Sequence, residues 1–197
     1  MLIANLLEMP KIADIQETPN PNAVKFILKE PVSYGTSHSF KAEGDASEDP
    51  LAKSIFDVGS VVSVFYMDKM ITVEKTDEAE WDEVLPTLAV PIRAAESVKP
   101  INGNGSKTVA AIGGAIAVAA SDDPKLTQIN LLLDERIRPY LAGDGGWLEI
   151  VELADHTLRI RYEGACGSCP SSLSGTLIAI ENMIKDEIDP EIEVVAV

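Results

Sequence analysis

Hydrophobic and polar positions in the first half of the chain follow the short period of β-strands. The segment 23–28 (AVKFIL) is rich in β-formers and comes directly after the Pro- and Asn-rich turn 18–22. The segments 61–66 (VVSVFY) and 70–74 (MITVE) have the same character and are joined by the short turn 67–69. We therefore predict one strand, followed later by a β-hairpin.

Two segments of the first half have the spacing of helices. In Pro50–Phe56 the apolar residues fall on one helical face, and the leading proline suits the first helical position. A polar, glycine-containing stretch up to Asp49 separates this helix from the first strand. Trp81–Ala94 is predicted to be a closing helix, interrupted at Pro86 and Pro91.

The second half begins with an amphipathic helix. Asp123 is the expected N-cap and Pro124 the first helical residue, while Pro139 and Gly143 mark the end. The apolar positions that recur three to four residues apart are Leu126, Ile129, Leu133, Ile137 and Tyr140. This spacing predicts a single helix with one buried face.

A hairpin, a second helix and a short strand complete the second half. Apolar and polar residues alternate on both sides of an Asp155-His156 turn, which predicts an antiparallel hairpin. From Pro170 to Pro190 the apolar residues have helical spacing, and a strand over 192–195 ends the chain. The alternating positions are Leu148, Ile150, Leu158, Ile160 and Tyr162, and the helical ones are Leu173, Leu177, Ile180 and Ile184. We expect an α+β domain with two helices against one sheet.

A loosely composed segment divides the chain into two parts. Residues 98–123 contain no aromatic residue and include the Ala- and Gly-rich run 109–120, so we interpret them as a flexible linker. The run could instead form a short helix, although its central Gly-Gly pair costs about 2 kcal/mol relative to Ala. The predicted fold class is α+β, with two small mixed domains at 1–97 and 124–197.

Composition restricts the class of protein and its partners. Of the 197 residues, 46% are hydrophobic and 24% are charged, which excludes disordered and fibrous classes. The net charge of −16 repels phosphate backbones and anionic lipid headgroups, so neither nucleic acid nor a membrane is an expected partner. The longest apolar run, at 109–120, is shorter than the roughly 18–20 residues that cross a bilayer. The first ten residues lack the basic, Arg-rich and cleavage-site features of targeting segments, so we expect no targeting signal there.

The two cysteines form the constellation with the clearest chemistry. Cys166 and Cys169 lie where the predicted hairpin passes into the helix that begins near Pro170. Amides and the dipole at a helix N-terminus stabilise thiolates, the form that binds metal, and Gly164 and Gly167 allow a tight turn there. Two cysteines are too few for a disulfide-stapled scaffold, so we expect metal or redox chemistry in a reducing compartment.

The number of ligands limits how a single chain holds a metal. Structural zinc and cubane iron–sulfur clusters take about four protein ligands, and this chain offers two thiols. Its two imidazoles lack metal-motif spacing to the thiols; we expect His38 on a surface loop and His156 in the hairpin turn. The simplest complete shell takes Cys166 and Cys169 from each of two subunits. Such a shared site is labile and suits a carrier.

Three other interpretations of the pair stay open at this point. The first is a pair of incidental thiols, which the glycines and proline around the turn argue against. The second is a thioredoxin-like dithiol, but here the pair follows an antiparallel hairpin late in the chain and the proline comes after it. The third is a zinc-bridged dimer, which metal analysis separates from a cluster.

Two parts of the chain resemble the Nfu family of iron–sulfur cluster proteins. Residues 124–197, with GDGG at 143–146 and GACGSCPSS at 164–172, resemble the C-terminal domain of NifU. Residues from about 15 to 94 resemble the N-terminal domain of mitochondrial-type and bacterial Nfu proteins. The segments that carry this second resemblance are 18–26, 50–56 and 64–73.

The resemblance implies a scaffold or carrier and not an enzyme. It implies that a [4Fe-4S] cluster from upstream assembly machinery is held between the subunits of a homodimer on Cys166 and Cys169. The cluster would then pass to apo iron–sulfur client proteins. A dithiol–disulfide oxidoreductase is the alternative function. The expected location is a bacterial cytoplasm, although an organelle matrix protein without its transit peptide would have the same sequence features.

Three further features have two interpretations each. The segment 143–146 is either a plain helix-to-strand turn or a loop that packs near the cysteines. Trp147 is either a partly buried anchor or a contact residue. The N-terminal domain has no cysteine, and its carboxylates either form a solvated face or dock client enzymes near the cluster. These carboxylates are Asp45, Glu48, Asp49, Asp77, Glu78, Glu80, Asp82 and Glu83.

Overall fold

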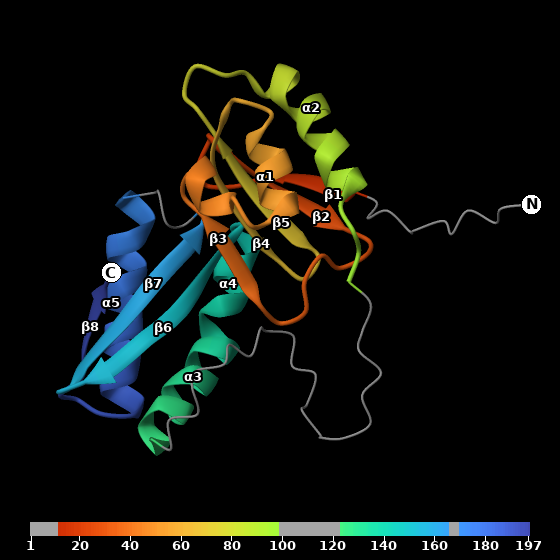
Figure 1. Ribbon diagram of the computed structural model, residues 1–197. Helices are drawn as coiled ribbons and strands as arrows, with labels where there is room; N and C mark the ends of the chain where they lie inside the picture. The colour runs from red at the N-terminus through yellow and green to blue at the C-terminus, as the bar shows by residue number, and fades with distance from the viewer. Residues whose placement is uncertain (1–11, 99–122, 166–169) are drawn as a thin grey trace, which may run out of the picture.

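Two α+β units make up the part of the chain that the computed structural model describes, residues 12–98, 123–165 and 170–197 (Figure 1). The predicted fold class is confirmed. The predicted linker, 98–123, lies outside the described residues except at its two ends, and so does the whole run 109–120. The domain boundaries therefore stay predictions.

The first unit is a five-stranded antiparallel sheet in the order β1-β2-β5-β4-β3. Helices α1 and α2 pack on one face of it and share its core. The strands are β1 Ile12–Glu17, β2 Ala23–Leu28, β3 Ser37–Phe40, β4 Val61–Met67 and β5 Met70–Lys75. The helices are the 3₁₀ turn η1 Glu43–Ala46, α1 Pro50–Phe56 and α2 Trp81–Ala94.

Apolar side chains on both faces of this sheet are buried. On β4, Val64 and Tyr66 belong to the core under the helices, whereas Phe65 and Met67 belong to a second apolar cluster. On β2, Lys25 is buried as well as its apolar neighbours. Since successive side chains of a strand point to opposite faces, the second face must also be covered. The second unit covers it, as described below.

Three predicted elements of this unit are confirmed: the strand at 23–28, the helix at 50–56 and the hairpin over 61–74. Two edge strands, β1 and β3, were not predicted, because short edge strands have few buried positions. The expectation for His38 is wrong: it lies on β3 opposite Tyr66, and the two rings stack 4.5 Å apart. Cross-strand pairing therefore fixes this imidazole in a sheet.

Helix α2 runs without a break through both of its prolines, contrary to the predicted interruption. Each proline removes one intrahelical hydrogen bond, but Pro86 lies on the exposed side. The opposite side packs Val84, Leu88 and Ile92 into the core, and all three are buried. Tertiary packing of this stripe holds the helix together despite the two missing amides.

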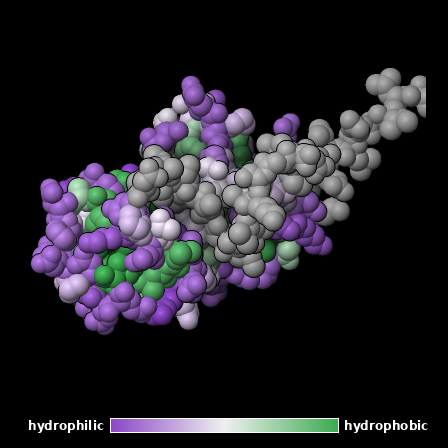
Figure 2. Space-filling view, turned by 90° about the horizontal axis from the view of Figure 1, so that it is seen from below, coloured by the Kyte–Doolittle hydropathy of each residue, from purple (hydrophilic) through white to green (hydrophobic). Residues whose placement is uncertain are grey.

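The second unit is a three-stranded sheet, β6-β7-β8, with helices on one face. β6 and β7 form the predicted antiparallel hairpin, and β8 is parallel to β7 because α5 connects them as a crossover. From below, Figure 2 shows a mostly hydrophilic surface with an apolar area over this unit. The elements are α3 Pro124–Arg136, α4 Arg138–Gly143, β6 Gly146–Ala154, β7 Thr157–Gly164, α5 Pro170–Glu187 and β8 Glu193–Ala196.

The single helix predicted after Asp123 is instead two helices that meet at Ile137. Pro139 causes the break, because it has no amide to donate and its ring clashes with the preceding turn. The continuous apolar stripe is therefore lost, and Tyr140, predicted to be buried, is 76% exposed. The break also buries Arg138, whose guanidinium donates to the Leu148 carbonyl at 3.1 Å.

Asp49 joins the start of α1 to the sheet, which gives a test of the first unit. Its Oδ1 accepts from the Ala52 amide at 2.8 Å, and its Oδ2 accepts from the Tyr66 hydroxyl at 2.5 Å. Asp49→Ala removes the helix cap and leaves the buried Tyr66 hydroxyl without this acceptor, so we expect the free energy of unfolding to fall by about 2–3 kcal/mol. Tyr66→Phe should cost only about 1 kcal/mol. Equal losses in urea titrations of the two variants would contradict the capping role.

Candidate functional site

Both flanks of the predicted cysteine site are described, although Cys166 and Cys169 themselves lie outside the described residues. β7 ends at Gly164, Ala165 follows it, and the 18-residue helix α5 begins at Pro170. The strand and the helix predicted on either side of the pair are therefore confirmed. The roles of the two thiols remain predictions.

Two glycines bring the start of β6 and the end of β7 together beside this position. Gly145 (φ +78°) and Gly164 (φ +65°) both have left-handed backbone. A Cβ on Gly164 would lie 2.4 Å from the Gly145 carbonyl oxygen, so no larger residue fits without a shift. The Ala165 amide donates to the same carbonyl at 3.2 Å. The segment 143–146 is thus a helix-to-strand turn that also packs against the residue preceding Cys166.

Polar side chains of the first unit reach the same turn. Thr72 Oγ1 donates to the Gly145 carbonyl at 2.7 Å, and Lys25 Nζ donates to the carbonyls of Ala142 at 3.1 Å and Gly143 at 2.5 Å. Thr72 is 2% exposed and Lys25 is 5% exposed. Sequence patterns did not predict these contacts, because an isolated polar residue on a strand ordinarily marks a solvent-facing position.

Apolar side chains surround these hydrogen bonds. Trp147, the first residue after the glycine turn, packs with Phe65, Met67 and Met70 of the first unit in one buried cluster, with Ala142 at its edge. Trp147 is 2% exposed, so it is an anchor that is more deeply buried than predicted. One end of the β6-β7 hairpin therefore meets the outer face of the first sheet through apolar side chains (Figure 1).

A buried carboxyl group lies at the edge of this contact. Glu163 is 5% exposed, and its Oε2 has no hydrogen-bond partner within the described part of the chain. Burial, together with the charge of Glu149, raises the pKa of Glu163 to about 7. The Ser37 hydroxyl, which donates to Glu149 Oε1 at 2.6 Å, partly offsets the rise in the pKa of Glu163, and so do the charges of Arg161 and Lys41.

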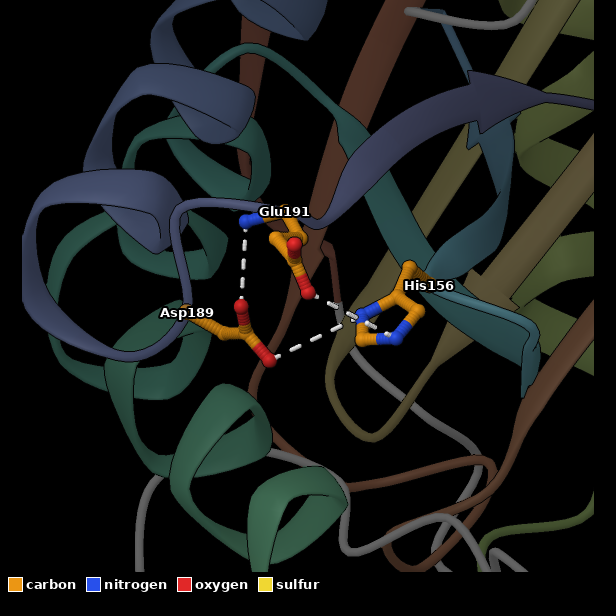
Figure 3. Close-up of side chains that lie close together, drawn as sticks. All are labelled: His156, Asp189 and Glu191. Atoms are coloured by element: carbon orange, nitrogen blue, oxygen red, sulfur yellow. Dashed lines mark hydrogen bonds and ion pairs between the residues drawn. The ribbon is translucent and has the colours of Figure 1, made fainter.

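His156 lies in the hairpin turn, as predicted, within a cluster of charged side chains (Figure 3). Its Nδ1 is 3.8 Å from Asp189 Oδ2, and its Nε2 is 3.8 Å from Glu191 Oε2. Lys125 Nζ donates to the same Asp189 oxygen at 2.5 Å and so occupies the place that a cation would take. We interpret Lys125 and Asp189 as an ion pair that joins α3 to the connection to β8, with the His156 ring of the hairpin turn beside it.

Comparisons with known proteins cover both units. The family profile described as "Scaffold protein Nfu/NifU N terminal" matches residues 12–97, and the one described as "NifU-like domain" matches residues 129–195. A human protein named "NFU1 iron-sulfur cluster scaffold homolog, mitochondrial" is 34% identical over 90% of this chain and 68% of its own length. This chain belongs to the Nfu/NifU family. The resemblance seen in the sequence is confirmed.

A plant relative and one solved structure also match this chain. "NifU-like protein 5, mitochondrial" of Arabidopsis thaliana is 36% identical over 86% of this chain, which spans 62% of that relative's length. A crystal structure of a Staphylococcus aureus protein is 34% identical and covers 41% of this chain and 96% of its own, with a TM-score of 0.37.

Among the described helices, none is long and apolar enough to cross a bilayer.

The buried Glu163 gives a pH-dependent prediction. Its pKa in the native state, about 7, is higher than its ordinary value of 4.5, so the native state holds this proton more tightly than the unfolded state. The free energy of unfolding should therefore fall by about 2–3 kcal/mol between pH 5 and pH 8 on account of this group.

Glu163→Gln keeps the shape of the side chain and removes the titration. In a Trp81→Phe background, Trp147 is the sole tryptophan, and its emission reports the contact between the units. We expect denaturant titrations to show the loss of stability with rising pH in the parent and not in the Glu163→Gln variant. The same pH slope in both proteins would show that Glu163 is not the group responsible.

Proposed function

We propose that this chain is a carrier of iron–sulfur clusters with no catalytic turnover of its own. A [4Fe-4S] cluster is its cargo, bound by Cys166 and Cys169 from each of two subunits. The observation that carries the proposal is the Cys-Gly-Ser-Cys-Pro sequence between the end of β7 and the start of α5, in a NifU-like domain. Relatives named as iron–sulfur cluster scaffolds support the cargo class.

The ligand count supports a shared site. A cubane cluster takes about four thiolates, and each chain has only two cysteines. Two chains therefore complete the shell without any other ligand. The helix that begins at Pro170 places its unpaired amides and positive dipole end next to the cysteine pair in the sequence, which favours thiolates over thiols.

Release follows from ligand exchange. An acceptor thiolate attacks one iron, a new iron–sulfur bond forms, and the bond from that iron to Cys166 or Cys169 breaks, so that the leaving cysteine is again a thiolate. No electron is transferred, and each exchange conserves the number of thiolates on the cluster. A shell divided between two subunits comes apart when the subunits separate, which suits delivery rather than storage.

The setting of this exchange is a reducing compartment, because the two thiols must stay free. The relatives are named as mitochondrial, and an organelle matrix or a bacterial cytoplasm both fit this requirement. Upstream assembly machinery loads the carrier, and apo iron–sulfur proteins receive the cluster. The first unit, which has no cysteine, presents an acidic surface at which these clients dock.

Anaerobic reconstitution with iron and sulfide tests the cargo. We expect a brown protein with thiolate-to-iron absorption and about two irons and two sulfides per chain. Cys166→Ser and Cys169→Ser should each abolish binding, because half of the shell is lost. Ser168→Ala, which lies between the two cysteines and removes no thiol, is the matched control and should bind like the parent.

Other outcomes contradict the proposal in distinguishable ways. A colourless protein that binds zinc at one ion per two chains would indicate a structural bridge. A colourless protein with a reducible bond between Cys166 and Cys169, which forms mixed disulfides when only the first cysteine is kept, would indicate an oxidoreductase.

The acidic surface of the first unit gives a separate prediction. Glu78, Asp82 and Glu83 are exposed around the start of α2. Replacing them together by Gln, Asn and Gln should lower the rate of cluster transfer to an apo-protein severalfold while the cluster content stays unchanged, and should weaken the dependence of that rate on salt. Asp186→Asn with Glu193→Gln, two exposed sites of the second unit, is the control. Equal effects of the two sets would exclude a docking role for the first unit.

A further inference from the structure

The first unit contacts the second at the glycine turn between α4 and β6, where the Gly145 carbonyl accepts a hydrogen bond from Ala165, the residue that precedes Cys166. The contacts join strands β2, β4 and β5 to the connection between α4 and β6. The proposed function assigns no role to this contact. The hydrogen bond from the Ala165 amide connects this contact to the residue before Cys166.

We propose that the first unit positions the cysteine pair in cis, through a chain of hydrogen bonds from Thr72 to the Gly145 carbonyl to the Ala165 amide. Thr72 is here a positioning residue for cluster binding. This inference rests on the proposed function, because positioning has a purpose only if the thiols hold a metal.

The Gly145 carbonyl is the centre of the chain of bonds. Its oxygen accepts from Thr72 Oγ1 at 2.7 Å and from the Ala165 amide at 3.2 Å, which uses both of its lone pairs. Ala165 is covalently bonded to Cys166. A displacement of this carbonyl therefore displaces the amide at the root of the cysteine segment.

The Thr72 side chain is held in place from both sides. Thr72 lies on β5, paired with Lys25 on β2 and with Phe65 on β4. It is 2% exposed, so its hydroxyl has no access to bulk water as an alternative partner. A hydrogen bond in such surroundings is more costly to lose than one at the surface.

Lys25 supplies a second attachment to the same turn. Its ammonium donates to the carbonyls of Ala142 and Gly143, the last two residues of α4. A cation at the end of a helix satisfies carbonyls that lack intrahelical partners. Burial lowers the pKa of Lys25, while the charge of Asp144 opposes that shift. The turn is thus held at two points by one sheet.

Phe65 touches the other strand of the hairpin. A Cβ built on Gly164 would lie 3.0 Å from the Phe65 ring. The first unit therefore contacts both Gly145, which starts the turn into β6, and Gly164, which ends β7. These two contacts hold both of the strand ends that the hydrogen bond from Ala165 joins.

The test compares two substitutions at Thr72 in the full-length chain. Thr72→Val keeps the shape and removes the hydroxyl, and Thr72→Ser keeps the hydroxyl. In the cluster-free protein we expect hydrogen exchange of the Ala165 amide to accelerate about three- to tenfold in Thr72→Val, the range that corresponds to one hydrogen bond, and alkylation of Cys166 by iodoacetamide to accelerate by a similar factor. Thr72→Ser should restore both rates. Thr87→Val, which removes a hydroxyl that donates to the Val84 carbonyl inside α2, is the matched control.

The cluster-loaded protein supplies a second readout. Release of iron to a chelator should be faster in Thr72→Val than in the parent, Thr72→Ser or Thr87→Val. Faster exchange at Ala165 with unchanged alkylation and release would show that the contact is structural only, and would overturn the inference. Unchanged exchange would overturn it as well. If the parent binds no cluster, the proposed function fails, but the exchange and alkylation rates still decide whether the first unit positions the cysteines.

Discussion

The close approach of Gly145 and Gly164 is the constraint on which both units depend. Because Gly164 has no side chain, the carbonyl of Gly145 enters the space that a Cβ would fill, 2.4 Å from its position. That approach lets the Ala165 amide reach the carbonyl, and it leaves the second lone pair for Thr72. A larger residue at Gly164 would separate the two strand ends and remove the point at which the sheets meet.

The contact between the sheets explains burial that neither unit explains alone. In the first unit, helices cover Val64 and Tyr66, and the other unit covers Phe65 and Met67. Lys25 is fully enclosed in a chain of net charge −16, where a lone cation has many possible acidic partners, yet its donors go to backbone carbonyls. Lys25 therefore holds the turn through its hydrogen bonds, while burial lowers its pKa and the nearby charge of Asp144 opposes that shift.

Local patterns were sufficient for much of the fold. The alternation on both sides of Asp155-His156 predicted the second hairpin, and the helical spacing from Pro170 predicted α5. The break at Ile137 was missed, because the apolar spacing continues across it while Pro139 prevents a continuous helix. The proline effect was overestimated in α2, where packing of the buried stripe outweighs the lost hydrogen bonds.

The candidate site, too, could be predicted from the sequence only in part. Residue type and spacing identified Cys166 and Cys169 as candidate ligands, and the strand and helix around them are where they were expected. The contacts of Thr72 and Lys25 join positions far apart in the sequence, and no local pattern carries that information. Trp147 is the residue that came closest to indicating a contact between the units, because a large aromatic side chain beside a glycine turn needs a surface to cover it.

The central claim is that one cluster is shared by two chains, and native mass spectrometry of the anaerobically reconstituted protein tests it most directly. The account predicts that the added mass of the cluster is found on the two-chain species, and that single chains carry none. In mixtures with an isotopically labelled Cys169→Ser chain, the cluster should be found on unlabelled pairs and not on mixed ones. A cluster mass on single chains, or equal loading of mixed pairs, would contradict the shared site.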